Sequence, residues 1–179
     1  MRDFIHQHEK ELILFIGCGL IPAAMIRVLF LMDYPYGNVT GLLNDPFWKI
    51  PTHITALLML WHLVFCLYRI GIRTKEKKTV VHDLSILVFL IVATVFMPYV
   101  EYFTIYSLAH VILALLSLYW LNYLFLTYCG RSQTIKNIYI FAFSFSVLHC
   151  LTYGEITGTA EIVYGLALSV LVSIEAANA

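Results

Sequence analysis

The sequence contains too little charge for a fold surrounded by water. Only 12% of its 179 residues are charged, whereas 61% are hydrophobic. A soluble domain carries roughly 25% charged residues. The eleven basic and eleven acidic residues cancel one another, which leaves no positive surface typical of nucleic-acid binding. The composition predicts an integral membrane protein whose surroundings are the lipid bilayer, with no nucleic-acid partner.

Motifs for disulfides, metals and catalysis are also lacking. The four cysteines show no Cys-x-x-Cys spacing, and no His-x-x-x-His or His-Glu-x-x-His pair occurs. His53 and His62 are nine residues apart and, at ~100° per residue, would lie on opposite faces of one helix. Haem would need two facing axial ligands, and His62 and His110 are expected at different depths. We therefore predict no metal, no cofactor and no catalytic residues.

Six apolar runs are long enough for transmembrane helices, which need ~20 residues each. They cover about residues 12–32, 51–70, 81–100, 104–126, 138–153 and 160–174. With Arg27 inside a span, nine of the other ten basic residues fall on one side and only Lys49 falls on the other. Cytoplasmic loops carry such an excess. We predict a single all-α domain of six helices over residues 1–179, with both termini cytoplasmic, in a bacterial inner (plasma) membrane.

Ionisable residues in and beside these spans form the candidate binding site. Such residues are costly in a membrane and often functional. Arg27, His110 and His149 would lie ~8–9 Å from the outer ends of three helices, with His62 near the midplane and Asn122 the main polar residue of the inner half. These positions predict a polar cavity open to the outer face, with eight candidate ligand-binding residues: Arg27, His53, His62, Glu101, His110, His149, Glu155 and Glu161.

A structural explanation for these residues stays open. Arg27 could pair with Glu161 or Glu101 for orientation alone, and a histidine in a span commonly hydrogen-bonds a neighbouring helix.

Small residues recur every four positions in the last span. Gly165, Ser169, Ser173 and Ala177 follow this spacing, which lets helix backbones approach closely in lipid. Two interpretations stay open: packing inside one subunit, or a homodimer interface through Gly165, Ser169 and Ser173.

The order of loops and motifs resembles the six-helix membrane sensors of histidine kinases that detect small α-hydroxyketone autoinducers. The features are a Tyr-Pro-Tyr-Gly-Asn loop at residues 34–38, a basic loop after the second span, Pro98, Ser-Gln-Thr at residues 132–134 and an acidic loop before the last span. The resemblance implies an amphipathic ligand with an alkyl chain held among the helices. In that family a kinase domain follows the sensor, whereas this sequence shows no kinase domain up to Ala179. An excised or free-standing sensor is therefore expected.

Three functional hypotheses follow. The first is a non-catalytic binding or sensor module in which Arg27, His110 and His149 hydrogen-bond the head of a small amphipathic ligand. The second is a proton- or ion-coupled transporter using Glu101, Glu161 and the histidines, which would need polar groups in both halves of the membrane. The third is a lipid-modifying enzyme with a histidine–acid site, either with or without a metal ion.

Overall fold

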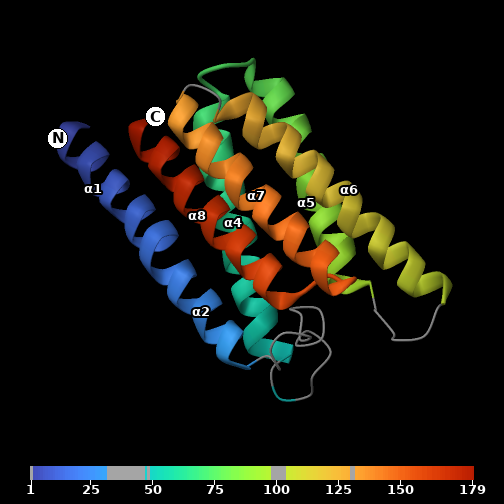
Figure 1. The fold of residues 1–179 in the computed structure, drawn as a ribbon. Helices are drawn as coiled ribbons and strands as arrows, with labels where there is room; N and C mark the ends of the chain where they lie inside the picture. Colours follow the sequence, from blue (N-terminus) through green and yellow to red (C-terminus); the bar gives the residue numbers. More distant parts are fainter. Residues whose placement is uncertain (1, 32–46, 48, 98–103, 130–131) are drawn as a thin grey trace.

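The computed structural model is all-α and describes residues 2–31, 47, 49–97, 104–129 and 132–179. Its elements are α1 (Arg2–Phe15), η1 (Ile16–Leu20), α2 (Ile21–Leu31), α4 (Lys49–Gly71), α5 (Lys77–Phe96), α6 (Ile105–Tyr128), α7 (Gln133–Tyr153) and α8 (Gly158–Asn178). Because α1, η1 and α2 form one continuous rod, the fold has six helices that are long and apolar enough to cross a membrane (Figure 1). The predicted fold class is confirmed.

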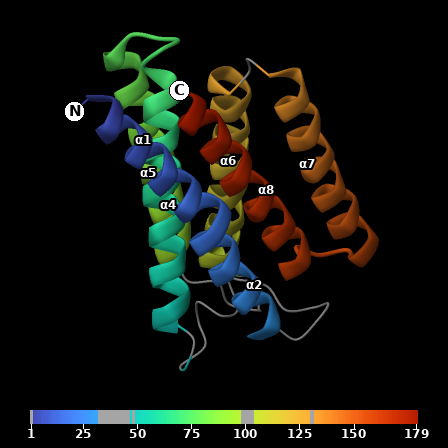
Figure 2. The same cartoon turned by 90° about the vertical axis from the view of Figure 1, so that its left-hand side faces the viewer.

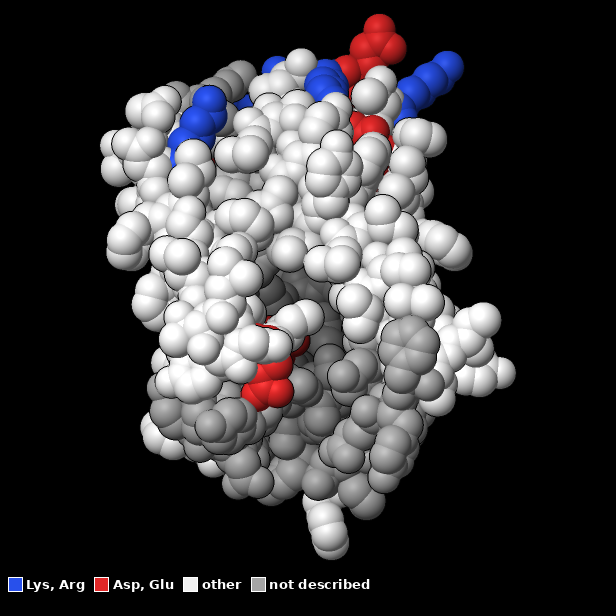
Figure 3. Space-filling view, turned by 45° about the vertical axis from the view of Figure 1, so that its right-hand side comes forward, with Lys and Arg blue, Asp and Glu red and all other residues white. Residues whose placement is uncertain are grey.

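Both chain ends and the α4–α5 turn lie at the same end of the bundle (Figure 1). We call this the basic end, because the Lys and Arg side chains of the face in Figure 3 gather there. The α7–α8 connection lies at the opposite end. The cytoplasmic location of the basic end stays a prediction.

Local capping fixes where three helices begin. The hydroxyl oxygens of Thr104, Ser132 and Thr157 accept backbone N–H bonds at the starts of α6, α7 and α8. These caps satisfy donors that have no partner inside the helix. At the end of α7, Gly154 adopts φ 74°, a left-handed conformation that favours glycine. The acidic loop at Gly154 and Glu155 is therefore an ordered turn, fixed by the glycine that ends α7 and the threonine that caps α8.

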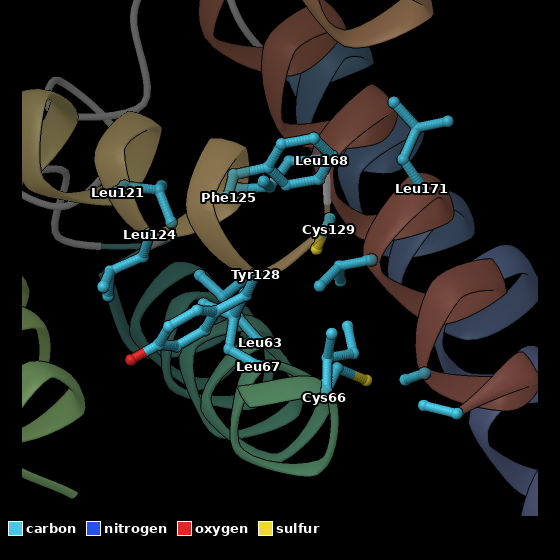
Figure 4. Packing of buried hydrophobic residues seen from close by; sticks show 14 of the residues in the cluster. Leu63, Cys66, Leu67, Leu121, Leu124, Phe125, Tyr128, Cys129, Leu168 and Leu171 are labelled. Atoms are coloured by element: carbon cyan, nitrogen blue, oxygen red, sulfur yellow. The ribbon is translucent and has the colours of Figure 1, made fainter. Parts of the chain in front are cut away.

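Helix α8 is the central helix of the bundle. It contacts α1, η1, α2, α4 and α7, and Figure 2 shows it between the α1–α2 rod and α7. Its residues Leu168 and Leu171 contribute to a core that also includes Leu63 and Leu67 of α4 and Phe125 of α6 (Figure 4). The apolar face of α8 is therefore covered by neighbouring helices, whereas a larger part of each other span is exposed to its surroundings.

The π-helical segment η1 depends on a proline and on a serine from α8. The Ile21 N–H donates to Ile16 O, five residues back, so it does not reach the Gly17 carbonyl. The next residue, Pro22, has no N–H. The Ser169 hydroxyl donates to Gly17 O instead, at 2.8 Å. The irregular backbone is thus satisfied by a neighbouring helix, as membrane burial requires.

The small residues of α8 pack inside one chain, which answers the question that the sequence left open. Ser169 bonds to the Gly17 carbonyl, Ser173 lies 2.8 Å from the His62 ring, and Gly165 faces Met25. All three are buried. The other interpretation, a homodimer interface through Gly165, Ser169 and Ser173, finds no support at this face, because α1–α2 and α4 already fill it.

Candidate functional site

A cavity of about 520 Å³ lies between α6, α7 and α8; we call it the α6–α7 cavity. Its size is within the range of small-molecule sites, about 300–1,000 Å³. Most of its wall is apolar and comes from helix faces. The lining residues are Ala114, Leu115, Leu118, Phe143, Ser146, Val147, Cys150, Leu151, Gly154, Glu155, Ile156, Ala160, Glu161 and Tyr164.

The cavity exists because α6 and α7 diverge. Helix α6 packs on α5 and helix α7 packs on α8, whereas α6 and α7 hardly touch within the described residues. Phe143, Val147 and Cys150 recur at three- to four-residue intervals and share one face of α7. The space between the two helices is therefore lined by side chains that point toward each other without meeting.

Tyr139 lies just beyond the cavity toward the basic end, four residues before the lining residue Phe143. Its ring stacks on Phe125 with centroids 3.9 Å apart, and its hydroxyl donates to Asn122 Oδ1 at 2.6 Å. The Tyr164 hydroxyl lies 2.7 Å from the Tyr139 hydroxyl. Because Tyr164 also lines the cavity, this hydrogen-bonded chain forms its floor and joins α6, α7 and α8.

The other end of the cavity carries two carboxylates. Glu155 is exposed in the α7–α8 turn and Glu161 is half-buried in the first turn of α8. Figure 3 shows acidic atoms beside a hollow in the part of the face that lies away from the Lys and Arg side chains. An acid near a helix N-terminus is favourable in itself. At this position it also offers an acceptor to a ligand with hydroxyl or amino hydrogens.

His149 stabilises the turn beside this mouth. Its Nδ1 lies 2.8 Å from the Thr157 hydroxyl, and its ring lies 4.7 Å from the Tyr153 ring. Thr157 is fully buried and caps α8. The contacts of His149 therefore link the end of α7 to the start of α8, outside the cavity wall.

The other predicted site residues lie at separate places. His110 Nδ1 is 3.0 Å from Met97 O, at the α5–α6 connection. His53 packs its ring 5.8 Å from Phe96, and Arg27 is exposed on α2. Glu101 lies outside the described residues. Of the predicted site residues that the structure describes, Glu155 and Glu161 alone line the α6–α7 cavity. A binding role for the others stays a prediction.

His62 occupies a buried junction of three helices. Its Nε2 lies 2.8 Å from Ser173 Oγ and 3.5 Å from Cys66 Sγ, and Ser173 in turn donates to Ser169 O. Cys66 is on the same helix, α4, and Ser173 is on α8. The arrangement matches the structural explanation, in which a histidine bonds a neighbouring helix. Among the described residues, no group of three or more His, Cys, Asp or Glu could hold a metal ion.

Polar contacts toward the basic end were underestimated from sequence. Besides Asn122 and Tyr139, the buried Asp83 accepts a bond from the Tyr128 hydroxyl at 2.8 Å and pairs with Lys75 at 3.4 Å. The Trp120 indole N–H donates to Asp83 O. The polar atoms of buried tyrosine and tryptophan side chains need hydrogen-bond partners. This need for partners was the signal in the sequence from which these polar contacts could have been expected.

Comparisons of the chain with protein-family models, with curated proteins and with solved structures found no match. Of the resemblance to six-helix sensors, the structure supports the layout of six candidate membrane-spanning helices.

Proposed function

We propose that this protein is a membrane-embedded, non-catalytic binding module that takes a small amphipathic ligand into the α6–α7 cavity. The observation that carries this proposal is the polarity of the cavity along its length. Its walls are apolar, its floor carries Tyr164, whose hydroxyl contacts that of Tyr139, and its mouth carries Glu155 and Glu161. The ligand's alkyl chain lies against the walls and its head group lies at the α7–α8 turn.

The walls and the mouth define the class of ligand. From Phe143 to Leu151 the α7 wall is eight residues long, or ~12 Å at the helical rise, which suits a medium-length alkyl chain. Carboxylates accept hydrogen bonds and repel other anions. A hydroxyketone or an alkylamine therefore fits the mouth better than a fatty-acid anion.

Ligand-dependent thermal unfolding of the detergent-purified protein tests this function. The panel contains medium-chain hydroxyketones, alkylamines and fatty acids of equal chain length. A ligand present at 100 times its Kd stabilises the folded state by ~2.7 kcal/mol. We expect hydroxyketones or amines to raise the unfolding temperature more than fatty acids do.

Matched variants locate the binding. Ala114→Phe places a large side chain in the cavity and should abolish the stabilisation by ligand. Ala23→Phe, on the exposed face of α2, should preserve it. Glu155→Gln and Glu161→Gln should weaken amine binding, with Glu76→Gln in the α4–α5 turn as control. Equal stabilisation of the Ala114→Phe and Ala23→Phe variants would show that the cavity is not the site.

The same assay separates the earlier hypotheses. Arg27→Ala and His110→Ala test the two candidate residues that lie outside the cavity; loss of stabilisation in either would bring that residue into the binding site. Stabilisation by a divalent metal, reversed by a chelator, would favour the metal-dependent enzyme over the binding module.

A further inference from the structure

A second apolar depression lies on the other side of the bundle, between α4 and α5; we call it the α4–α5 groove. It encloses about 650 Å³ and shares no lining residue with the α6–α7 cavity. Trp61 and Phe65 stack along one wall with centroids 6.1 Å apart, and Val81 and Phe89 contribute to the other. Trp61 is 57% exposed and Phe89 69% exposed, so the groove is open to whatever surrounds the helix pair.

The groove faces the bilayer. Helices α4 and α5 are both candidate membrane spans, so acyl chains surround their exposed apolar faces. A straight acyl chain can lie along a groove between two nearly apolar walls, where it gains more contacts than on a convex helix surface. Apolar contact alone does not select one lipid over another.

The basic residues at the end of the groove supply selectivity. Arg69 pairs with Glu9 and Lys75 pairs with Asp83, so these two cations are compensated. Arg73, Lys77 and Lys78 are exposed, and none of the three forms an ion pair with a described residue. Three positive charges of the α4–α5 turn are thus available to an anion outside the protein.

One of these charges, Lys77, is in register with the groove. Lys77 precedes Val81 by four residues, and Val81 precedes Ser85 by four, so the three share one face of α5. Val81 and Ser85 line the groove. Lys77 therefore lies one helical turn beyond the lined part, where a lipid head group would stand if its chain followed the groove.

We propose that the α4–α5 groove is a binding site for an anionic phospholipid. One acyl chain lies against Trp61, Phe65 and Phe89, and the phosphate contacts Arg73, Lys77 and Lys78. A basic turn of this kind also serves to orient a membrane protein during insertion. That role requires charge only, whereas the site requires the charge and the groove together.

Quenching of Trp61 fluorescence tests the site, because Trp61 forms part of its wall. The chain has three tryptophans, and Trp48→Phe with Trp120→Phe leaves Trp61 as the reporter. The protein is placed in nanodiscs containing a small fraction of phosphatidylglycerol or phosphatidylcholine with identical brominated chains. We expect the phosphatidylglycerol to quench Trp61 at a lower mole fraction than the phosphatidylcholine.

Charge variants establish that the turn is responsible. Lys77→Gln and Lys78→Gln should each reduce the preference for phosphatidylglycerol by about fivefold, the effect of one basic residue near an anionic surface. Lys136→Gln, on α7, is the matched control and should leave the preference unchanged. Because Trp120→Phe removes a hydrogen bond to Asp83 O, native mass spectrometry of the otherwise unaltered chain with an equimolar mixture of the two lipids provides a second measurement.

Three outcomes would overturn the proposal. Equal quenching by both lipids would show that the groove does not select anions. An equal loss of preference in the Lys136→Gln control would assign the effect to general surface charge. Displacement of the brominated lipid by millimolar glycerol phosphate would show that the charges bind a free phosphate without help from the groove.

Discussion

Helices α7 and α8 have similar lengths and are both rich in apolar residues, yet they occupy opposite environments. In the most apolar stretch of each, 56% of α8 residues are buried within the protein, compared with 17% in α7. Helix α8 contacts the α1–α2 rod, α4 and α7, whereas α7 packs chiefly on α8. The same kind of composition therefore produces a central helix in one case and a peripheral helix beside a cavity in the other.

Side-chain size explains the difference. The buried face of α8 carries Gly165, Ser169 and Ser173, which let the α1–α2 rod and α4 approach closely. Helix α7 exposes Phe141 and Leu148 to the surroundings, and its attachment to α6 rests largely on Tyr139. Close packing depends on small residues at one interface, and the cavity depends on the lack of an equivalent interface between α6 and α7.

The largest predicted effect is at the close approach of η1 to α8. A Cβ added at Gly17 would overlap the side chains of Ser173 and His62, with Ser173 Cβ only 2.7 Å away. Gly17→Ala should therefore lower the free energy of unfolding by about 2 kcal/mol or more. Thermal unfolding in detergent measures the change.

Gly19 provides the control for this substitution within the same π-helical segment. A Cβ at Gly19 meets no atom within 4 Å, so Gly19→Ala should be neutral or slightly stabilising, because alanine is the better helix former. Equal effects of the two substitutions would contradict the close approach of η1 to α8.

A smaller effect is expected where α6 and α7 join. Tyr139→Phe removes the hydrogen bonds to Asn122 and Tyr164 and retains the ring that stacks on Phe125. We expect a loss of about 1 kcal/mol in the free energy of unfolding and a wider separation of α6 and α7. Spin labels on Leu116 and Phe141, both exposed, would report the separation.

The matched control for the hydroxyl is Tyr119→Phe on the exposed face of α6, which should change neither stability nor separation. An unchanged separation in Tyr139→Phe would show that the stacked ring alone closes the cavity floor.

The smallest effect concerns thiol reactivity and should leave stability unchanged. Burial raises the pKa of the Cys129 thiol, and the nearby Glu175 carboxylate adds to the rise. Each unit between the pKa and the working pH lowers the reactive thiolate about tenfold. At pH 8, single-cysteine chains should therefore show Cys129 unreactive toward a small maleimide until the protein unfolds.

Cys150 gives the opposite expectation, because it lines the α6–α7 cavity and is partly exposed. It should react in the folded protein, and a medium-chain ligand should slow the reaction. Rapid labelling of Cys129 in the folded state would contradict its burial at the end of α6.

The spans were predictable because transfer into lipid depends on the local run of apolar residues, which is a property of the sequence. Helix bounds differ from the predicted spans mainly at their polar ends: α1 begins at Arg2 and α7 begins at Gln133, since a helix can continue beyond the apolar region. The roles of single polar residues were less accessible. The depths of the histidines in the membrane could be predicted from the sequence, but their partners could not. Ser173 lies 111 residues after His62 in the chain, and Thr157 lies eight residues after His149.

By itself, the sequence determined that this chain is a six-helix membrane protein, because hydrophobic run length and charge scarcity act residue by residue. Only the tertiary structure decided which helix is central, since both α7 and α8 could cross a membrane alone. It also decided that Glu155 and Glu161 share a cavity while His53, His62 and His110 do not. The physical reason is that helix packing depends on the sizes of side chains that come from distant parts of the sequence. Gly17 leaves room for Ser173 of α8, and Tyr139 of α7 bonds to Asn122 of α6 toward the basic end.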